Sequence, residues 1–165
     1  MKTPSLKMRA ISLLSQREHS RSEMRQKLLR SLRKDSVAAS SGEAVSETTQ
    51  EHDPALEVEA LLDWLQAQDY LSEARFVESR VHARAARYGN LRIKQELAQH
   101  GLSLSAEKQA ELKDGEFERA KAIWQRKFGG QVAQDLALKA KQMRFLLARG
   151  FSSETIRKLL NAREE

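Results

Sequence analysis

Residues 89–97 read GNLRIKQEL, and their spacing occurs twice more in the chain: residues 20–28 read SRSEMRQKL and residues 152–160 read SSETIRKLL. In each stretch a residue suited to a helix N-cap is followed four and eight positions later by apolar residues, which share one face of a helix. Each stretch also begins six residues after an apolar position of a preceding helical pattern. The sequence therefore predicts that one helix-pair unit is used three times.

The composition favours an all-α fold. The 165 residues include only seven Gly and two Pro, and good helix formers such as Ala, Leu, Arg, Lys, Glu and Gln dominate. Apolar periodicity predicts eight or nine helices, grouped in units of about three, because stacked units can bury the apolar face that one unit leaves open. The expected domains are residues 1–68, 69–114 and 115–165.

One segment breaks the helical pattern. Residues 35–52 are mostly small, polar or acidic, with few large apolar side chains, so their burial cannot offset the entropy of ordering. A mobile acidic and Ser-rich loop is expected there, after a helix that ends near residue 32. The last helix pair is expected at about residues 132–149 and 152–161.

The net charge of +6 is unevenly distributed. Residues 1–34 carry ten basic and two acidic side chains, residues 35–73 carry ten acidic side chains and no Lys or Arg, and residues 74–165 carry 19 basic and 11 acidic side chains. Basic surfaces separated by an acidic belt favour binding to nucleic acid or to an acidic protein groove.

The sequence argues against catalysis and cofactors. The absence of Cys excludes disulfides and thiolate chemistry, and the four His residues lack the spacing of a metal site. No phosphate-binding Gly-rich loop is present, and His19 with its neighbouring serines fits capping and turn roles better than a nucleophile. We expect no catalytic site, metal or cofactor. The lack of Cys fits a reducing compartment, and no signal peptide or membrane span is evident.

Arginines at helical spacing are the candidate contact residues. On the helix expected after Ser72, three of them fall within an arc of roughly 60° at 100° per residue. Guanidinium groups suit phosphate oxygens, and such contacts are largely independent of base sequence. The residues expected to contact nucleic acid or a partner are Arg17, Arg21, Arg25, Arg80, Arg84, Arg87, Arg92, Lys94, Arg144 and Arg149.

Four groups of residues resemble a known family. The segments are Arg9-Ala10 to Leu14 with Arg17-Glu18-His19-Ser20 and Leu28; Asp69-Tyr70-Leu71-Ser72-Glu73 with Arg75-Phe76; Gly89 with Ile93, Glu96-Leu97 and Gly101-Leu102; and Arg149-Gly150-Phe151 with Ile156. In these segments the chain resembles the RecX regulatory proteins, bacterial modulators of the RecA recombinase. It departs from the family pattern at Asp69, where Gly is usual, and at Ser72, where an acid is usual. The insertion at residues 35–52 also looks longer than usual.

The resemblance implies a cytoplasmic, non-enzymatic protein of tandem three-helix repeats in an elongated, curved array. It also implies binding to RecA and its filament on single-stranded DNA. That binding would inhibit filament extension, ATP hydrolysis, strand exchange and coprotease activity in recombination, DNA repair and the SOS response. A monomer with weak, sequence-independent DNA binding is expected. Two other classes stay open: a helix-turn-helix transcription regulator that reads duplex DNA, and a helical-repeat adaptor that binds protein alone.

Overall fold

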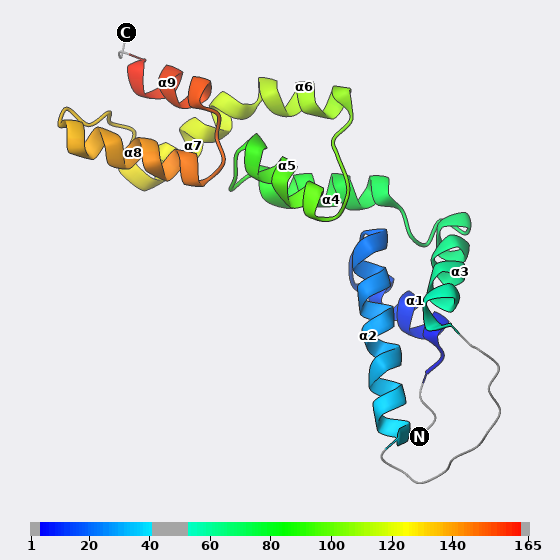
Figure 1. Ribbon diagram of the computed structural model, residues 1–165. Coiled ribbons are helices and arrows are strands. Elements are labelled where there is room, and N and C mark those ends of the chain that lie inside the picture. The colour runs from blue at the N-terminus through cyan, green and yellow to red at the C-terminus, as the bar shows by residue number, and fades with distance from the viewer. Residues whose placement is uncertain (1–3, 41–52, 163–165) are drawn as a thin grey trace. The chain divides into compact units, whose positions relative to one another are not determined.

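The computed structural model describes residues 4–40 and 53–162. Within these ranges the chain forms nine α-helices and no β-strand (Figure 1), which confirms the all-α prediction. The helices are α1 (Leu6–Gln16), α2 (Arg21–Ser40), α3 (Pro54–Ala67), α4 (Glu73–Ala85), α5 (Asn90–Gln99), α6 (Ala106–Asp114), α7 (Glu116–Phe128), α8 (Leu136–Ala148) and α9 (Ser153–Asn161).

Local capping explains where many of these helices begin. An N-cap oxygen accepts a hydrogen bond from one of the otherwise unpaired N–H groups of the first turn. Side chains make this bond at Ser5, Asp53, Ser105, Asp135 and Ser152. At the C-terminal end of α7, Gly129 adopts a left-handed φ of 74°, a conformation that glycine enters without a Cβ clash.

The contacts divide the chain into two compact units, residues 1–76 and residues 77–165. In the first unit α2 packs against α1 and α3. Met24 and Leu28, the apolar positions predicted from the repeat, are fully buried. They belong to a core that also contains Ala10, Val58, Leu62, Leu65 and Leu71. The predicted apolar stripe on α2 is thus confirmed as a core-facing stripe.

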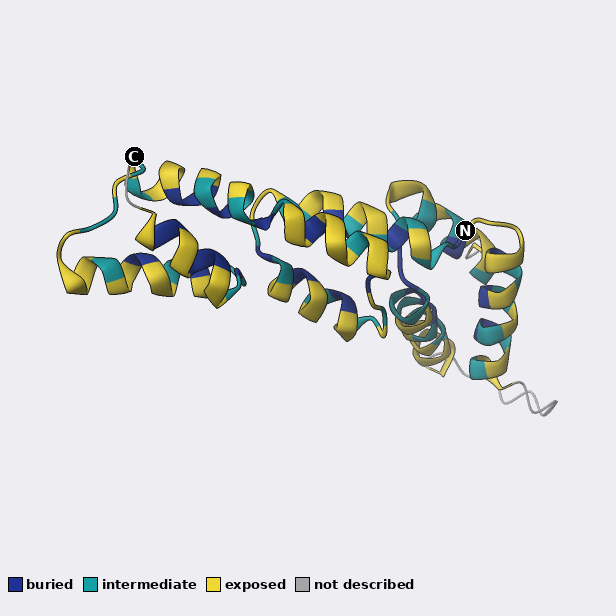
Figure 2. Cartoon of the chain, turned by 90° about the horizontal axis from the view of Figure 1, so that it is seen from above, coloured by how far each residue is buried: buried dark blue, intermediate teal, exposed yellow. Residues whose placement is uncertain are grey.

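In the second unit the corresponding stripes of α5 and α9 are also buried: Ile93 and Leu97 on α5, and Ile156 and Leu160 on α9. The buried cluster around α9 includes residues of α7 and α8, with which α9 packs. Figure 2 shows this arrangement as dark inner faces and yellow outer faces on the helices. Helices α2, α5 and α9 therefore each bury the residues that lie four and eight positions after the N-cap.

Two glycines allow the second and third helix pairs to meet backbone to backbone. Gly89 donates its N–H to the carbonyl of Arg149 at 2.8 Å, and Leu91 donates to the carbonyl of Gly150 at 3.1 Å. A Cβ placed on Gly89 would lie 2.3 Å from Gly150 O, far inside van der Waals contact. Glycine at 89 is therefore required by this close approach, in addition to its role at the start of α5.

A buried carboxylate connects the starts of α5 and α9. Glu116, at the first position of α7, is 4% exposed. Its Oε1 accepts from the backbone N–H of Asn90 at 3.2 Å, and its Oε2 accepts from the hydroxyls of Ser152 and Thr155 at 2.8 Å each. The starts of α5 and α9 are thus joined through one side chain, which satisfies donors that would otherwise be buried without partners.

The prediction of a loop at residues 35–52 was partly wrong. Helix α2 continues through Ser40, so residues 35–40 are helical, and residues 41–52 lie outside the described residues. The carboxylate of Asp35 forms an ion pair with Arg9 of α1 at 2.6 Å. This cross-helix pair favours continuation of the helix beyond its last buried apolar position, Leu28.

Helix α8 also begins later than expected, at Leu136 rather than near Val132. The side chain of Gln142 donates to the carbonyl of Gln131 at 3.0 Å, which gives the preceding segment a polar partner outside a helix. Asp135 then caps α8 by accepting from Ala137 N–H. The domain boundaries at 68/69 and 114/115 and the curvature of the array stay predictions.

Candidate functional site

In the first unit, the expected contact residues are paired with carboxylates of the same unit. Arg21 reaches Glu59 and Asp63 of α3, each at 2.8 Å, and Arg25 reaches Glu59 at 2.5 Å. The hydrogen bonds that Arg21 and Arg25 donate hold the pKa of Glu59 below its ordinary value. Much of the positive charge predicted on this face of α2 is therefore offset by α3.

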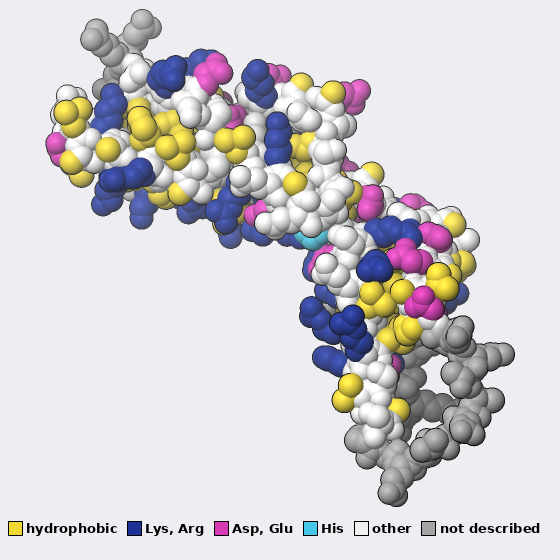
Figure 3. Space-filling view, in the orientation of Figure 1, with side chains coloured by type: hydrophobic (Ala, Val, Ile, Leu, Met, Phe, Trp, Pro, Cys, Tyr) yellow, Lys and Arg dark blue, Asp and Glu magenta, His cyan; other side chains and the backbone are white. Residues whose placement is uncertain are grey.

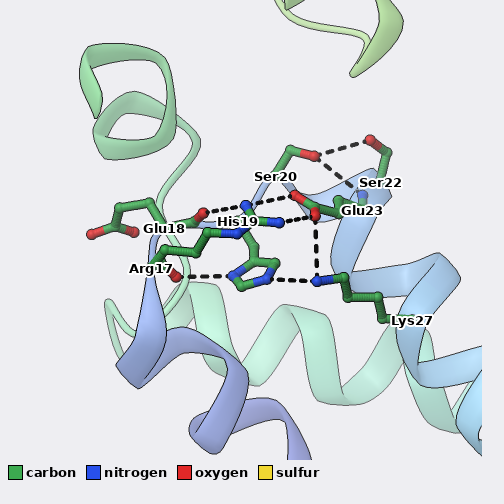
Figure 4. Close-up of polar contacts among 7 residues, drawn as sticks. All are labelled: Arg17, Glu18, His19, Ser20, Ser22, Glu23 and Lys27. Atoms are coloured by element: carbon green, nitrogen blue, oxygen red, sulfur yellow. Dashed lines mark hydrogen bonds and ion pairs between the residues drawn. The ribbon is translucent and has the colours of Figure 1, made fainter. Parts of the chain in front are cut away.

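Arg17 lies in a polar cluster at the turn between α1 and α2 (Figure 4). Its guanidinium pairs with Glu23 and donates to the carbonyl of Glu18 at 3.1 Å. Beside it, the buried His19 places Nδ1 2.9 Å from the carbonyl of Arg17 and Nε2 3.1 Å from Nζ of Lys27. The cluster therefore fixes the connection between the two helices.

Burial lowers the pKa of His19 from its ordinary value, which favours a neutral ring. In that state Nδ1–H donates to the backbone carbonyl and Nε2 accepts from Lys27. With both ring nitrogens engaged, His19 has no free nitrogen with which to take a proton from a serine. Ser20 instead caps α2 by accepting from Glu23 N–H at 3.1 Å. The geometry fits the capping role that the sequence favoured.

The continuation of α2 exposes cations that the sequence analysis did not select. Arg30, Arg33 and Lys34 are exposed, and none forms an ion pair with a residue that the structure describes. Figure 3 shows Lys and Arg side chains along one edge of α2. The helix was expected to end near residue 32, so Arg33 and Lys34 were placed outside it, and Arg30, within it, was not selected. The run of bases at 25–34 was the available signal.

In the second unit, arginines from three different helical segments converge on one aromatic ring. The guanidinium carbons of Arg84, Arg92 and Arg149 lie 5.6, 4.5 and 5.4 Å from the ring centroid of Tyr88. These residues come from α4, α5 and the end of α8, brought together by the contact between Gly89 and Gly150. Cation–π attraction to the ring helps to hold three like charges at close quarters. We call Arg84, Tyr88, Arg92 and Arg149 the Tyr88 cluster.

Backbone carbonyls and one carboxylate fix the guanidiniums of the Tyr88 cluster. Arg149 donates to the carbonyl of Arg87 at 3.1 Å, and Arg92 donates to that of Ala148 at 3.4 Å. Glu96 lies 2.9 Å from Arg84 and 3.8 Å from Arg92. A single neighbouring carboxylate leaves the cluster with excess positive charge.

A hollow of about 350 Å³ opens beside the Tyr88 cluster. Its lining residues in the described part of the chain are Arg80, Arg84, Arg92, Gln95, Glu96, Gln99 and His100. Arginine and glutamine side chains present many N–H donors, which suit phosphate or carboxylate oxygens. The hollow therefore has the donors and the charge of an anion-binding surface.

The other expected contact residues lie outside this hollow. Arg87 and Lys94 are exposed on the same unit, and Arg144 is exposed on α8. The structure thus brings Arg80, Arg84, Arg92 and Arg149 near one another, whereas the other six expected residues are distributed over both units. Whether any of the ten binds a partner stays a prediction.

The described residues contain neither a membrane-spanning helix nor a metal-binding group. No helix there has the length and apolar character needed to cross a membrane. No group of three or more His, Asp or Glu side chains in these residues is arranged to hold a metal ion. Among the arginines predicted from the sequence, those at the Tyr88 cluster and its hollow have the most specific surroundings.

Two family models match successive parts of the chain. Residues 72–106 match the family model for the second three-helix domain of RecX, and residues 114–160 match that for the third. Arg84, Tyr88 and Arg92 of the Tyr88 cluster lie in the first of these matches, and Arg149 lies in the second.

Several similar proteins carry the name regulatory protein RecX. That of Ralstonia nicotianae is 46% identical over 158 residues, covering 94% of this chain and 86% of the relative. That of Herminiimonas arsenicoxydans is 45% identical over 163 residues, covering 98% and 94%. That of Pseudomonas entomophila is 38% identical over 159 residues, covering 94% and 89%. The similarity therefore extends over nearly the whole of each pair.

Proposed function

The chain belongs to the RecX family of regulatory proteins, and we propose that it binds the RecA recombinase and the RecA filament on single-stranded DNA. Binding there mainly inhibits filament extension, ATP hydrolysis, strand exchange and coprotease activity. The observation that carries this proposal is the near-full-length similarity to proteins named regulatory protein RecX. The protein acts as a cytoplasmic, non-enzymatic monomer in recombination, DNA repair and the SOS response.

The Tyr88 cluster is the contact region we assign within the second unit. Its arginines are held by backbone carbonyls and by the Tyr88 ring, so they lose little further freedom when an anion binds. Guanidinium groups form paired hydrogen bonds with either carboxylates or phosphates. The hollow beside the cluster therefore suits an acidic filament surface or the exposed phosphates of its DNA.

A titration of RecA's DNA-dependent ATPase tests the proposal. Substoichiometric protein reduces the ATPase rate, because one regulator bound to a filament affects many subunits. No effect at molar excess over RecA would refute the proposed function.

Two double variants test the assigned region. Arg80→Ala with Arg84→Ala removes two cations that line the hollow and raises the half-inhibitory concentration about tenfold, as expected for two partly exposed charge contacts. The matched control, Arg126→Ala with Lys127→Ala, removes the same charge from exposed positions on α7 and leaves inhibition near the wild-type level. Circular dichroism checks that both variants keep their helicity. Equal inhibition by the two variants would remove the Tyr88 cluster from the contact region.

DNA binding without RecA separates this proposal from the two alternatives. A transcription regulator binds one duplex sequence far more tightly than others, and a protein-only adaptor binds no DNA. We expect weak binding to single-stranded DNA that does not depend on sequence. If about five phosphates are contacted, a fourfold rise in salt weakens that binding by roughly two decades.

A further inference from the structure

A second hollow in the second unit is larger than the first, and its wall combines apolar side chains with lysine and amide side chains. It has a volume of about 1240 Å³ and lies between α7, residues 130–136 and the end of α9. Phe117, Trp124, Leu159 and Leu160 contribute apolar side chains to its wall. On the face seen in Figure 3, apolar side chains gather between α8 and α9, with Lys and Arg on either side. We call this feature the α7/α9 groove.

The size and exposure of the α7/α9 groove point to a peptide rather than a small molecule. Pockets for small ligands commonly measure about 300–1,000 Å³, so this groove is larger than most of them. Leu136, at its edge, is 83% exposed. Covering an exposed leucine with an apolar side chain of a partner removes apolar surface from water and therefore favours binding.

The charges around the groove select the kind of peptide. Lys121 and Lys139 line it, and no Asp or Glu occurs among the described residues that do so. Lys139 is directed by a hydrogen bond to Asn161 at 3.2 Å, which keeps its charge at the groove. Paired cations around an apolar floor complement a segment that carries both carboxylates and large apolar side chains.

We propose that the α7/α9 groove binds a short acidic segment of a partner protein through apolar anchor side chains, with Lys121 and Lys139 pairing its carboxylates. The anchors lie against the half-buried Phe117 and Val132 and the exposed Leu136, above a floor formed by the core residues Trp124, Leu159 and Leu160. This surface is separate from the hollow of the Tyr88 cluster, with which it shares no lining residue. The inference does not depend on the proposed action on RecA.

The indole group of Trp124 reports directly on the groove. Its Nε1–H is buried and has no hydrogen-bond partner among the described residues. The chain has two tryptophans, so the ¹⁵N-labelled 165-residue chain gives two indole cross-peaks in an NMR spectrum. A Trp64→Phe variant assigns them.

The probes are three pools of short synthetic peptides. The first contains Asp and Glu with Leu, Ile and Phe; the second replaces the acids by Lys and Arg; the third replaces the apolar residues by Ser and Gly. The first pool shifts the Trp124 cross-peak and leaves that of Trp64 in place, whereas the other two pools shift neither. An unmoved Trp124 cross-peak with the first pool, or an equal shift with the basic pool, would overturn the proposal.

Matched variants locate the binding. Lys121→Glu with Lys139→Glu weakens binding of the acidic pool about tenfold, since two attractions become repulsions. Lys127→Glu with Lys141→Glu makes the same charge change at exposed positions outside the groove and leaves the affinity nearly unchanged. Equal effects of the two double variants would reduce the interaction to non-specific charge attraction and overturn the proposal.

A further pair of variants tests the apolar part without disturbing a core. Leu136→Ser removes an exposed groove residue and weakens binding severalfold. Leu138→Ser removes a leucine that is 53% exposed on the same helix but does not line the groove, and it leaves binding unchanged. Unaltered binding by Leu136→Ser would exclude Leu136 from the site. The experiment contains no RecA and no DNA, so its failure leaves the proposed regulatory function untouched.

Discussion

The close approach of Gly89 to Gly150 leads to a quantitative prediction for Gly89→Ala. An added Cβ would lie 2.3 Å from both Gly150 O and Phe151 N, whereas an ordinary contact measures 3.4–4 Å. The obstructing atoms belong to the backbone, so no side-chain rotation can relieve the clash. The two segments must move apart by about 1 Å, as overpacked sites do.

Such a movement breaks two hydrogen bonds, because the N–H of Gly89 is 2.8 Å from Arg149 O and the N–H of Leu91 is 3.1 Å from Gly150 O. Each lost bond lowers the free energy of unfolding by about 1 kcal/mol. Overpacking adds about 1–3 kcal/mol. We therefore expect Gly89→Ala to destabilise the second unit by about 4 kcal/mol.

Urea denaturation followed by Trp124 fluorescence measures this loss. In a Trp64→Phe background the remaining tryptophan lies in residues 77–165, so the signal reports the second unit. With a urea dependence of about 2 kcal/mol per molar, the midpoint falls by about 2 M.

Gly115→Ala is the matched control. Gly115 is also a helix N-cap without a side-chain cap bond, and its φ of −86° is accessible to alanine. Its added Cβ would lie 3.2 Å from the end of the Arg119 side chain, and the nearest backbone atom, Glu111 O, is at an ordinary contact distance of 3.7 Å. We expect a change below about 1 kcal/mol, within the range of mild substitutions. If Gly89→Ala were as mild as Gly115→Ala, the inferred backbone contact would be incorrect.

Three further predictions concern the polar groups of the two units. Glu116→Ala leaves the hydroxyls of Ser152 and Thr155 without their buried acceptor and lowers the stability of the second unit by about 3 kcal/mol, measured by the same fluorescence assay; a loss below about 1 kcal/mol would contradict the assigned network. Burial lowers the pKa of His19 in the folded state below 6.5, so as the pH falls the unfolded chain takes up the proton first, and the free energy of unfolding decreases as the pH drops through 6.5. His19→Gln reduces this decrease, measured by urea titrations at neutral and mildly acidic pH. An equal decrease in the variant would show that His19 is not its cause. Arg21→Ala lowers the stability of the first unit by about 1 kcal/mol through loss of its pairs with α3, whereas Arg30→Ala changes it by less than about 0.5 kcal/mol; thermal unfolding would refute this ranking if the order were reversed.

Helix positions were predictable because they depend on neighbours in the sequence. The repeated apolar spacing placed Met24, Ile93 and Ile156 on core-facing sides, and all three are buried. Ser152 was expected to cap a helix from its residue type, and it does. The predictions were less accurate where a distant partner acts, as at Asp35, whose pair with Arg9 lies in a segment expected to be loop.

The candidate site was harder to predict because charge on a helix face does not reveal what packs opposite it. Arg21 and Arg25 share a face by spacing, but α3 places Glu59 against both. Conversely, nothing in the local sequence of Arg84 indicates that Arg149 lies beside the same tyrosine ring.

The sequence by itself determined that this chain is helical, that its helices recur in similar units, and that it resembles the RecX family. These properties follow from short-range periodicity, capping and motif spacing. Tertiary structure decided which cations keep an excess of charge and why Gly89 must be glycine, because both depend on groups about 60 residues away in the chain. Packing brings such groups together through the burial of apolar faces, and the order of residues within one helix does not specify which distant groups will meet.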